Sequence, residues 1–475
     1  MQFTITKSDF LFYMDAPRHL WAKKHGQLDN YVPSPYDQHL MAQGQEIEKW
    51  AERYIQEIVL SEYNSPIIFE AQRKFVDKHF EVIVDGLVYD PDSKMYDLYE
   101  IKSSTSVKTE HVYDATFQSI VCEANIPLRK TYLVHLNKDY VRDGETELEK
   151  LFAVEDLSEE VAAKKEEILL LREQAWRDIS LDSYESVQDC LKPNDCPCKK
   201  LCHPNLPADP IYNLPRLHKN KARDLKSKGI LSIKDIPDGY KLSDNQQLHL
   251  KVVKSGRPFL DTAAVASELA QLSPPIYFLD YETYNPAIPW FDGYHPYQQV
   301  VFQYSLHIFR GEGSELEHFE WVETGAGDPA LKILESLAEN IGETGSVVVW
   351  NKSFEAGRNR EMGLLYPQYK ELLESINDRM FDLAVLFQKG YYVHADFFGS
   401  YSIKKVLPVL APDVNYDELA IPDGTQAMVA WAKIMAGDLS VDEAEKTESD
   451  LLTYCELDTM AMVRIWQAVL KILET

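Results

Sequence analysis

The stretch of the chain that decides the fold of its C-terminal part is IYFLDYETY, residues 276–284. Its run of apolar residues predicts a buried β-strand, and two carboxylates, Asp280 and Glu282, stand towards its end. Because successive side chains of a strand point to opposite faces, both carboxylates point to the same face of a sheet. Two ionised carboxylates side by side repel each other unless a cation lies between them, so the pair predicts a site for Mg²⁺ or Mn²⁺.

Two later segments supply side chains that fit such a site. The apolar run SVVVWN predicts another strand, and Glu355 follows it. The segment SDLLTYCELDTMAMVRIW predicts an amphipathic helix on which Tyr454 and Asp458, four residues apart, share a face. Each motif alone is explained equally well by a solvated strand end or a surface helix pair. Their order along the chain, each on a fitting strand or helix, favours a functional site.

The three motifs together resemble those of the DEDDy group of 3′→5′ exonucleases, which have an RNase H-like fold. The resemblance implies that Asp280, Glu282 and Asp458 hold two metal ions. It also implies that Glu355 takes the place of the second-motif acid and that Tyr454 orients the attacking water. The group usually has aspartate where this chain has Glu355, which is a departure from the pattern.

A second acidic constellation lies nearer the N-terminus. FEVIVDGLVYD places Asp85 at the end of one predicted strand. After the turn PDSK, MYDLYEIKSST places Glu100 and Lys102 two residues apart on the next strand. An acid followed by acid-x-lysine on the neighbouring strand resembles the core of PD-(D/E)xK nucleases. The resemblance implies that Asp85 and Glu100 ligate Mg²⁺, while Lys102 polarises the water or stabilises transition-state charge.

Two flanking helices extend this resemblance to the RecB family. Gly44 and Glu48, on the first predicted helix, are similar to that family's first motif. Asp114 and Gln118, one turn apart in YDATFQSIV, are similar to its glutamine-bearing helix. Glu-x-Lys alone is best explained by a structural ion pair. Because Glu48, Asp85 and Gln118 accompany it in the family's order, we expect a nuclease site.

Four of the six cysteines lie close together, as Cys190, Cys196, Cys198 and Cys202. Their spacing is irregular for zinc, which commonly uses C-x₂₋₄-C pairs. RecB-like nucleases often carry a C-terminal cysteine group that completes a four-iron cluster, so the resemblance implies an iron–sulfur cluster, with zinc as the alternative. In related sequences the first ligand is a cysteine before a proline near the N-terminus, where this chain has Ala16. Either Cys198 replaces that ligand, or zinc or nothing binds.

The net charge of the chain limits which of its surfaces can bind nucleic acid. A formal net charge of −27 argues against a plain nucleic-acid-binding module, because phosphate neutralisation requires lysine and arginine. Basic residues concentrate in one stretch around Gly229. This stretch resembles a helix-hairpin-helix, which would bind phosphate. A solvated helix face explains the same residues equally well. These residues are Lys219, Lys221, Arg223, Lys226 and Lys228.

Predicted strands alternate with predicted helices, which indicates an α/β (α+β) protein of two or three domains. We expect a restriction-endonuclease-like, RecB-like domain with the cysteine cluster over 1–205, a basic helical linker over 206–270 and an RNase H-like domain over 271–475. The chain as a whole resembles an uncharacterised bacterial family, a domain of unknown function, which combines the two nuclease-like halves. Phrases such as GSYSIKKVLPVLAP are similar to that family's own signatures.

The function expected from these patterns is that of a metal-dependent nuclease acting on DNA or RNA, with ends or single strands as substrate. The alternative is a nucleic-acid-binding or scaffold protein whose carboxylates do not catalyse. A zinc-dependent regulatory protein is a third class, which rests on the cysteines alone. With neither a signal peptide nor a long apolar run in the sequence, we expect a cytoplasmic protein without a membrane partner.

Overall fold

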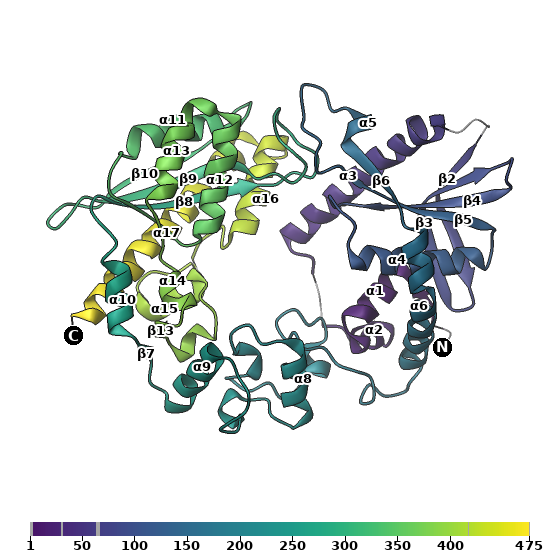
Figure 1. The fold of residues 1–475 in the computed structure, drawn as a ribbon, viewed down its shortest axis with the longest axis horizontal. Coiled ribbons are helices and arrows are strands. Elements are labelled where there is room, and N and C mark those ends of the chain that lie inside the picture. The colour runs from purple at the N-terminus through teal and green to yellow at the C-terminus, as the bar shows by residue number, and fades with distance from the viewer. Residues whose placement is uncertain (1–2, 30–31, 63–66, 417, 475) are drawn as a thin grey trace. The chain divides into compact units, whose positions relative to one another are not determined.

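The computed structural model of the chain describes residues 3–29, 32–62, 67–416 and 418–474. These residues form two compact units (Figure 1). Unit 1 consists of Met1–Asn205 together with Pro286–Gln298, and unit 2 consists of Leu206–Asn285 together with Gln299–Thr475.

A mixed sheet forms the centre of unit 1. Its strands in the described chain are β1 (Ile5–Thr6), β2 (Ile68–Asp77), β3 (Phe80–Asp90), β4 (Met95–Lys102), β5 (Leu128–Leu136) and β6 (Phe152–Asp156). They are arranged in the order β1-β3-β4-β5-β6, with β2 paired to β3 outside this path. The antiparallel β3–β4 pair is the hairpin that the sequence predicts around PDSK, and β4 pairs with β5 in parallel.

Helices cover both faces of this sheet. They are α1 (Lys7–Asp15), α2 (Pro17–Lys24), α3 (Pro35–Glu57), η1 (Val59–Glu62), α4 (Thr109–Glu123), α5 (Leu148–Leu151), α6 (Ser158–Ile179) and α7 (Lys199–Cys202). Leu98 of β4 packs with α1, α4 and α6, whereas Tyr99 and Ile101 pack with α3. The alternation of these neighbouring residues between two apolar clusters shows that β4 is buried on both faces.

Unit 2 is built on a second sheet. Its strands among the described residues are β8 (Ile276–Tyr284), β9 (Val300–Phe309), β10 (Glu317–Val322), β11 (Ser346–Val349) and β12 (Met380–Asp382). The order is β10-β9-β8-β11-β12, antiparallel up to β8 and parallel beyond it. A separate pair is formed by β7 (Phe259–Leu260) and β13 (Tyr392–Val393). The strand predicted over 276–284 is confirmed, and it lies at the centre of the sheet.

The helices of unit 2 determine which face of β8 carries the carboxylates. They are α8 (Lys219–Ser227), α9 (Asp244–Ser255), α10 (Thr262–Leu269), α11 (Pro329–Asn340), α12 (Lys352–Leu365), α13 (Lys370–Asp378), α14 (Val385–Gln388), α15 (Ile403–Leu410), α16 (Gly424–Ala436) and α17 (Val441–Leu473), with the 3₁₀ turns η2 (Ile211–Asn213), η3 (Ile233–Asp235), η4 (Pro367–Tyr369) and η5 (Ala395–Phe397). Tyr277 and Leu279 pack with α11, α12 and α13, whereas Phe278 packs with α14, α15 and α17. Asp280 and Glu282 are two and four residues after Phe278, so their side chains lie on the same face of β8 as Phe278 and face α17.

The predicted α+β class is confirmed, and the division into units adds two features to it. Residues 206–270, which the sequence predicts as a linker, belong to unit 2 and include a small apolar cluster around Leu225 and Ile233. The segment Pro286–Gln298, which joins β8 to β9, belongs to unit 1 by its contacts.

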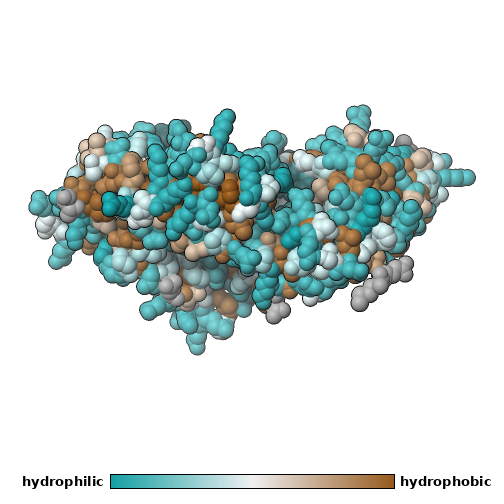
Figure 2. Space-filling view, turned by 90° about the horizontal axis from the view of Figure 1, so that it is seen from below, coloured by the Kyte–Doolittle hydropathy of each residue, from teal (hydrophilic) through white to brown (hydrophobic). Residues whose placement is uncertain are grey.

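The face of the molecule seen from below is mostly polar (Figure 2). Hydrophilic residues cover most of the face drawn in Figure 2, and hydrophobic residues lie scattered among them. Every helix in the described part of the chain is too short or too polar to cross a membrane.

Candidate functional site

Carboxylates from three parts of the chain meet in unit 2. Strand β8 contributes Glu282, which is buried, and Asp280, which is half-buried. Their carboxylate oxygens and the Cys455 sulfur of α17 all lie within 4.8 Å of one another. One turn further along α17, Asp458 is 8 % exposed. Glu355, in the first turn of α12, is also buried. The structure therefore brings together the four acids that the sequence singles out in this half.

The local sequence explains why Glu355 lies in the first turn of α12. Asn351 follows β11 as the N-cap of α12, and its side-chain oxygen accepts a hydrogen bond from the backbone N–H of Phe354 at 3.4 Å. Asparagine at this position satisfies one of the unpaired N–H groups at the start of a helix. Glu355 therefore follows directly on a capped helix start, and the N-x-x-F-E motif has a structural reason for its spacing.

Burial and mutual repulsion raise the pKa values of these acids. Burial, together with the charges of Glu355, Asp458 and Glu282, raises the pKa of Asp280 well above its usual range. Burial and the charge of Asp458 raise the pKa of Glu282 to about 8. The pKa values of Glu355 and Asp458 are raised in the same direction, again chiefly by burial. Four such groups ionise together only beside added positive charge.

Two tyrosines and one lysine surround the carboxylates. Tyr416 donates a hydrogen bond to Asp458 Oδ1 at 2.6 Å, and Tyr454 also hydrogen-bonds to Asp458. Lys404 of α15 lies over the rings of Tyr416 and Tyr454, at 5.1 and 5.3 Å from their centroids. Its charge lowers the pKa values of Glu282 and Asp458, against the effect of burial. Sequence analysis missed Tyr416 and Lys404, although the phrase GSYSIKKVLPVLAP contains Lys404.

Two further observations show that the site suits a small oxygen-seeking cation. Glu355 Oε2 is buried and makes no hydrogen bond within the described chain. Gly424 begins α16 beside Glu282, and a Cβ atom on this glycine would lie 3.4 Å from Glu282 Oε2 and 3.8 Å from the Tyr454 hydroxyl. An unsatisfied buried carboxylate oxygen, together with a missing side chain beside its neighbour, fits Mg²⁺ or Mn²⁺.

The acids of the N-terminal constellation also meet, and a lysine joins them. Lys7 Nζ lies 3.0 Å from Asp85 Oδ1 and 3.3 Å from Glu100 Oε1. Asp85 Oδ2 accepts the backbone N–H of Ile101 at 3.0 Å, next to the last paired residues of β3 and β4. Lys102 Nζ lies 2.7 Å from Glu100 Oε1, so these two residues share a face of β4. Sequence analysis missed Lys7, which is 78 residues from Asp85.

Helix α4 completes this group, whereas α3 contributes less than expected. Gln118 Nε2 donates to Glu100 Oε2 at 2.6 Å and to Asp114 Oδ1 at 3.1 Å. Asp114 Oδ2 also lies 2.5 Å from Lys102 Nζ. Glu48 of α3 accepts a hydrogen bond from Gln72 at 2.5 Å, and no ion pair or hydrogen bond within the described residues joins it to the other acids.

The charges in this group are distributed unevenly. Burial, with the charge of Glu100, raises the pKa of Asp85 to about 7 and that of Asp114 to about 6. Glu100 is also buried, but the charges of Lys102 and Lys7 lower its pKa to about 2. Glu100 in turn raises the pKa of both lysines, although burial acts in the opposite direction. Glu100 is therefore the anion around which the group is organised.

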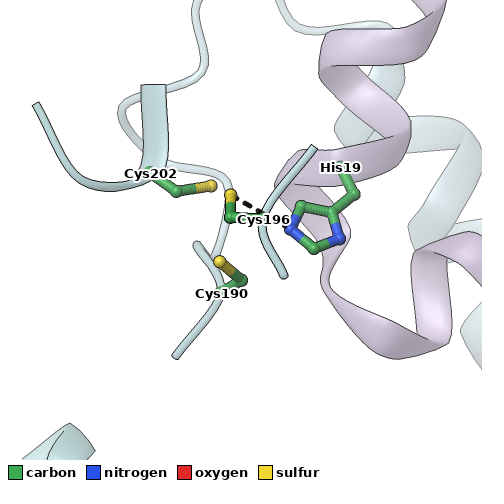
Figure 3. A group of neighbouring side chains, drawn as sticks. All are labelled: His19, Cys190, Cys196 and Cys202. Carbon is green, nitrogen blue, oxygen red and sulfur yellow. Dashed lines mark hydrogen bonds between the residues drawn. The ribbon is translucent and has the colours of Figure 1, made fainter. Parts of the chain in front are cut away.

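The cysteine cluster gathers around a histidine that the sequence analysis missed. Cys190, Cys196 and Cys202 converge with His19 of α2 (Figure 3). Cys198 lies next to this group, with its sulfur 3.6 Å from that of Cys202.

The predicted basic stretch borders a cavity of about 560 Å³ within unit 2. Lys221 lines it together with Arg216 and with the aromatic side chains of Tyr392 and Phe397. Lys228, by contrast, pairs with Asp224 at 2.7 Å on the surface of α8.

Comparison with known proteins shows similarity to proteins without an assigned function. Residues 277–402 match the family described as "Domain of unknown function (DUF2779)", which confirms the predicted resemblance over that part of the chain. "Uncharacterized protein UU173" of Ureaplasma parvum is 27 % identical over 446 residues, which cover 87 % of this chain and 63 % of that protein. "Uncharacterized protein MG366" of Mycoplasma genitalium is 31 % identical over 208 residues, which cover 40 % of this chain and 31 % of that protein. The matches thus span less than two thirds of either relative.

Proposed function

We propose that this chain is a metal-dependent nuclease that hydrolyses phosphodiester bonds of DNA or RNA, with a 3′→5′ exonuclease-like site in unit 2. The observation that carries the proposal is the convergence of Asp280, Glu282, Glu355 and Asp458, whose pKa values are all raised. Keeping three buried acids and one half-buried acid together costs stability, and this arrangement is typical of sites that work with cations. The strand order β10-β9-β8-β11-β12, with β8 central, supports an RNase H-like fold for this half.

The four acids would hold Mg²⁺ or Mn²⁺ between β8, α12 and α17. When bound, such ions supply an activated water and stabilise the leaving oxygen of a phosphodiester. The chain's own groups orient the reactants. Burial and the charge of Asp458 raise the pKa of Tyr454, so its hydroxyl keeps the proton that it donates to Asp458. The Tyr454 oxygen would orient the attacking water by accepting a hydrogen bond from it. The Lys404 ammonium offsets part of the negative charge of the site.

The constellation in unit 1 is proposed as a second, RecB-like nuclease centre. Asp85 and Glu100 would hold the cation, and Lys102 would stabilise the negative charge that develops on the phosphate. Gln118 fixes the orientation of Glu100 through its 2.6 Å hydrogen bond. Lys7 contacts the same two acids and adds a second positive charge that the resemblance alone does not include.

The substrate proposed for these sites is a nucleic-acid end or single strand. With a net charge of −27, phosphate binding depends on local basic groups such as Arg216 and Lys221 at the cavity of unit 2. Aromatic residues beside them, such as Tyr392 and Phe397, offer surfaces for base stacking. We also propose a cytoplasmic location, because a cluster of cysteines arranged to hold a metal is typical of proteins in reducing compartments.

Cleavage of labelled single-stranded DNA, double-stranded DNA and RNA, with Mg²⁺ or Mn²⁺, tests the proposal. We expect metal-dependent degradation. Asp280→Asn should lower the cleavage by unit 2, and Glu100→Gln the cleavage by unit 1, by about 100-fold or more. Glu312→Gln, at an exposed acid of unit 2, is the matched control and should retain full activity. If the unaltered protein binds these substrates but cleaves none of them with either ion, the nuclease proposal fails and a non-catalytic scaffold takes its place.

A further inference from the structure

The group around His19 is compact enough to be the ligand set of one ion. His19, Cys190, Cys196 and Cys202 each offer one donor atom, and all four atoms lie within 4.8 Å of one another. Figure 3 shows the three sulfurs and the imidazole pointing towards a common centre. His19 is 1 % exposed, and Cys190 and Cys202 are also buried. Three residues thus come from the segment before and within α7, and one comes from α2.

The spacing distinguishes one ion from an iron–sulfur cluster. Zinc with four tetrahedral ligands at about 2.3 Å places its sulfurs about 3.8 Å apart. In a four-iron cluster each thiolate binds a different iron at a different corner, so the four donor atoms stand further apart than the ligands of one ion. The Cys196 sulfur lies 3.6 Å from His19 Nε2, as ligands of one ion do. The residues therefore fit a single ion better than the expected cluster.

The orientation of His19 presents one ring nitrogen to the sulfurs. Its Nε2 lies 3.6 Å from the Cys196 sulfur. Its Nδ1 lies 3.0 Å from Asp15 Oδ2, one helical turn earlier, without a hydrogen bond between the two atoms. His203 Nε2 lies 3.1 Å from the Cys190 sulfur, where an N–H on this nitrogen would stabilise a thiolate.

We propose that His19 Nε2 and the thiolates of Cys190, Cys196 and Cys202 bind one structural zinc ion. Each of the three thiols gives up its proton when the ion binds. Cys198 stays outside the ligand set, beside Cys202 in an apolar pocket with Ala16 and Trp21. The histidine thus takes the place near the N-terminus that a cysteine occupies in related sequences, three residues after Ala16.

The zinc site connects the N-terminal helices α1 and α2 to the cysteine-bearing segment of unit 1. Arg18 on α2 donates to the carbonyl oxygens of Val187 at 2.8 Å and Leu201 at 2.9 Å, on the segment that carries the cysteines. Helix α2 is joined to α1 because Lys24 lies 2.6 Å from the buried Asp9. Lys7, which contacts Asp85 and Glu100, begins α1. The ion thereby stabilises the helix pair that positions Lys7.

Metal analysis of the purified full-length protein tests this inference. We expect about one zinc per chain and a colourless protein, since one tetrahedral ion saturates the four ligands. Replacement by Co²⁺ should give the visible absorption of tetrahedral cobalt with thiolate ligands. A brown protein that contains iron and acid-labile sulfide would overturn the inference, as would a protein that retains no transition metal.

Variants identify the ligands. His19→Ala should lose zinc, whereas the matched variant Cys198→Ala should retain it. Loss of zinc from Cys198→Ala together with its retention by His19→Ala would instead assign the four cysteines. Should His19→Ala fail to fold, His19→Cys serves in its place.

The His19→Cys protein should keep the ion. Its cobalt form should show stronger thiolate absorption than the cobalt form of the parent, because a fourth sulfur has been added. An unchanged cobalt spectrum contradicts the inference. Asp280→Asn and Glu100→Gln should leave the zinc content unaltered, which separates this site from the proposed nuclease centres.

Discussion

At the scale of single residues, the acids of unit 2 are held in a way that opposes folding. Asp280, Glu282, Glu355 and Asp458 all have raised pKa values because the folded protein removes them from water and places them beside one another. The only cation whose charge acts on both Glu282 and Asp458 within the described residues is Lys404. We infer that function, not stability, accounts for these four residues.

Asp280→Asn is expected to stabilise the protein in the presence of a chelator while abolishing cleavage by unit 2. The amide has nearly the shape of the acid but carries no charge to be desolvated, so the gain is on the order of 1–2 kcal/mol. Urea unfolding with chelator measures it, with Glu312→Gln as the neutral control. A less stable Asp280→Asn protein would indicate a structural role for this carboxylate.

The pH dependence of stability follows from Glu282. Its pKa rises from 4.5 in the unfolded chain to about 8 in the folded protein. Between these values the folded protein binds more protons than the unfolded chain, so the free energy of unfolding falls as pH rises. Asp85, with a pKa raised to about 7, acts in the same direction. The pKa of Glu100 is lowered to about 2, so the stability that its ionised form contributes is lost only when the pH falls from about 4.5 towards 2.

We therefore expect the free energy of unfolding in chelator to decrease from about pH 6.5 to about pH 8, by at most about 1.4 kcal/mol per pH unit for each group. Below this range the buried His111, His249 and His307, whose pKa values are lowered by burial, act in the opposite direction. Glu282→Gln should flatten the decrease, and Mn²⁺ should oppose it most strongly at the alkaline end. Urea titrations across this range provide the measurement. The same pH dependence in the parent and in Glu282→Gln would show that Glu282 is ionised in the folded state without a cation.

At the scale of elements, the site of unit 2 depends on how α16 begins. Asp423 caps the helix by accepting the backbone N–H of Gln426 at 2.9 Å, and the next residue, Gly424, lies against Glu282 and Tyr454. The positive end of a helix dipole beside these acids favours their ionised forms. A side chain at Gly424 would occupy the space next to Glu282 Oε2.

Gly424→Val is expected to reduce cleavage by unit 2 at least about tenfold, because its methyl groups would crowd the oxygen that holds the cation. The melting temperature should change little, since the first turn of a helix tolerates valine. Lys433→Val, at an exposed position near the other end of α16, is the control. Full activity of Gly424→Val would place the reacting groups away from this edge of the site.

At the scale of the whole molecule, the two units are not consecutive in sequence. The β8–β9 connection belongs to unit 1, where Ala287 and Ile288 pack into the apolar cluster of α3 and β4. Arg142 donates from Nη1 to the carbonyl oxygens of Pro289 at 2.9 Å and Trp290 at 2.5 Å. The chain therefore passes between the units three times, and a fragment ending at residue 205 lacks part of unit 1.

Arg142→Ala is expected to increase deuterium uptake in residues 286–298, because it removes donors from carbonyl oxygens that hold this segment in place. Hydrogen exchange followed by mass spectrometry measures the change. Arg53→Ala, an exposed arginine of α3, should leave the segment unaffected. Equal uptake in both variants would show that apolar packing alone retains the segment.

Local spacing in the sequence was enough to predict much of the candidate sites. The two-residue repeat of a strand placed Asp280 and Glu282 on one face, and the helical repeat placed Asp114 with Gln118. In these cases the geometry is set within one element. Glu48 shows the limit of the approach, because a position on a suitable helix did not ensure contact with the other acids.

Only the tertiary structure decided which elements meet. His19 joins cysteines more than 170 residues away, Lys7 reaches acids of β3 and β4, and Tyr416 reaches Asp458 on α17. No repeat in the sequence links such residues, because periodicity fixes a side chain's direction only relative to its own element. Which faces come together depends on how apolar surfaces from the whole chain are buried, and that is settled by packing.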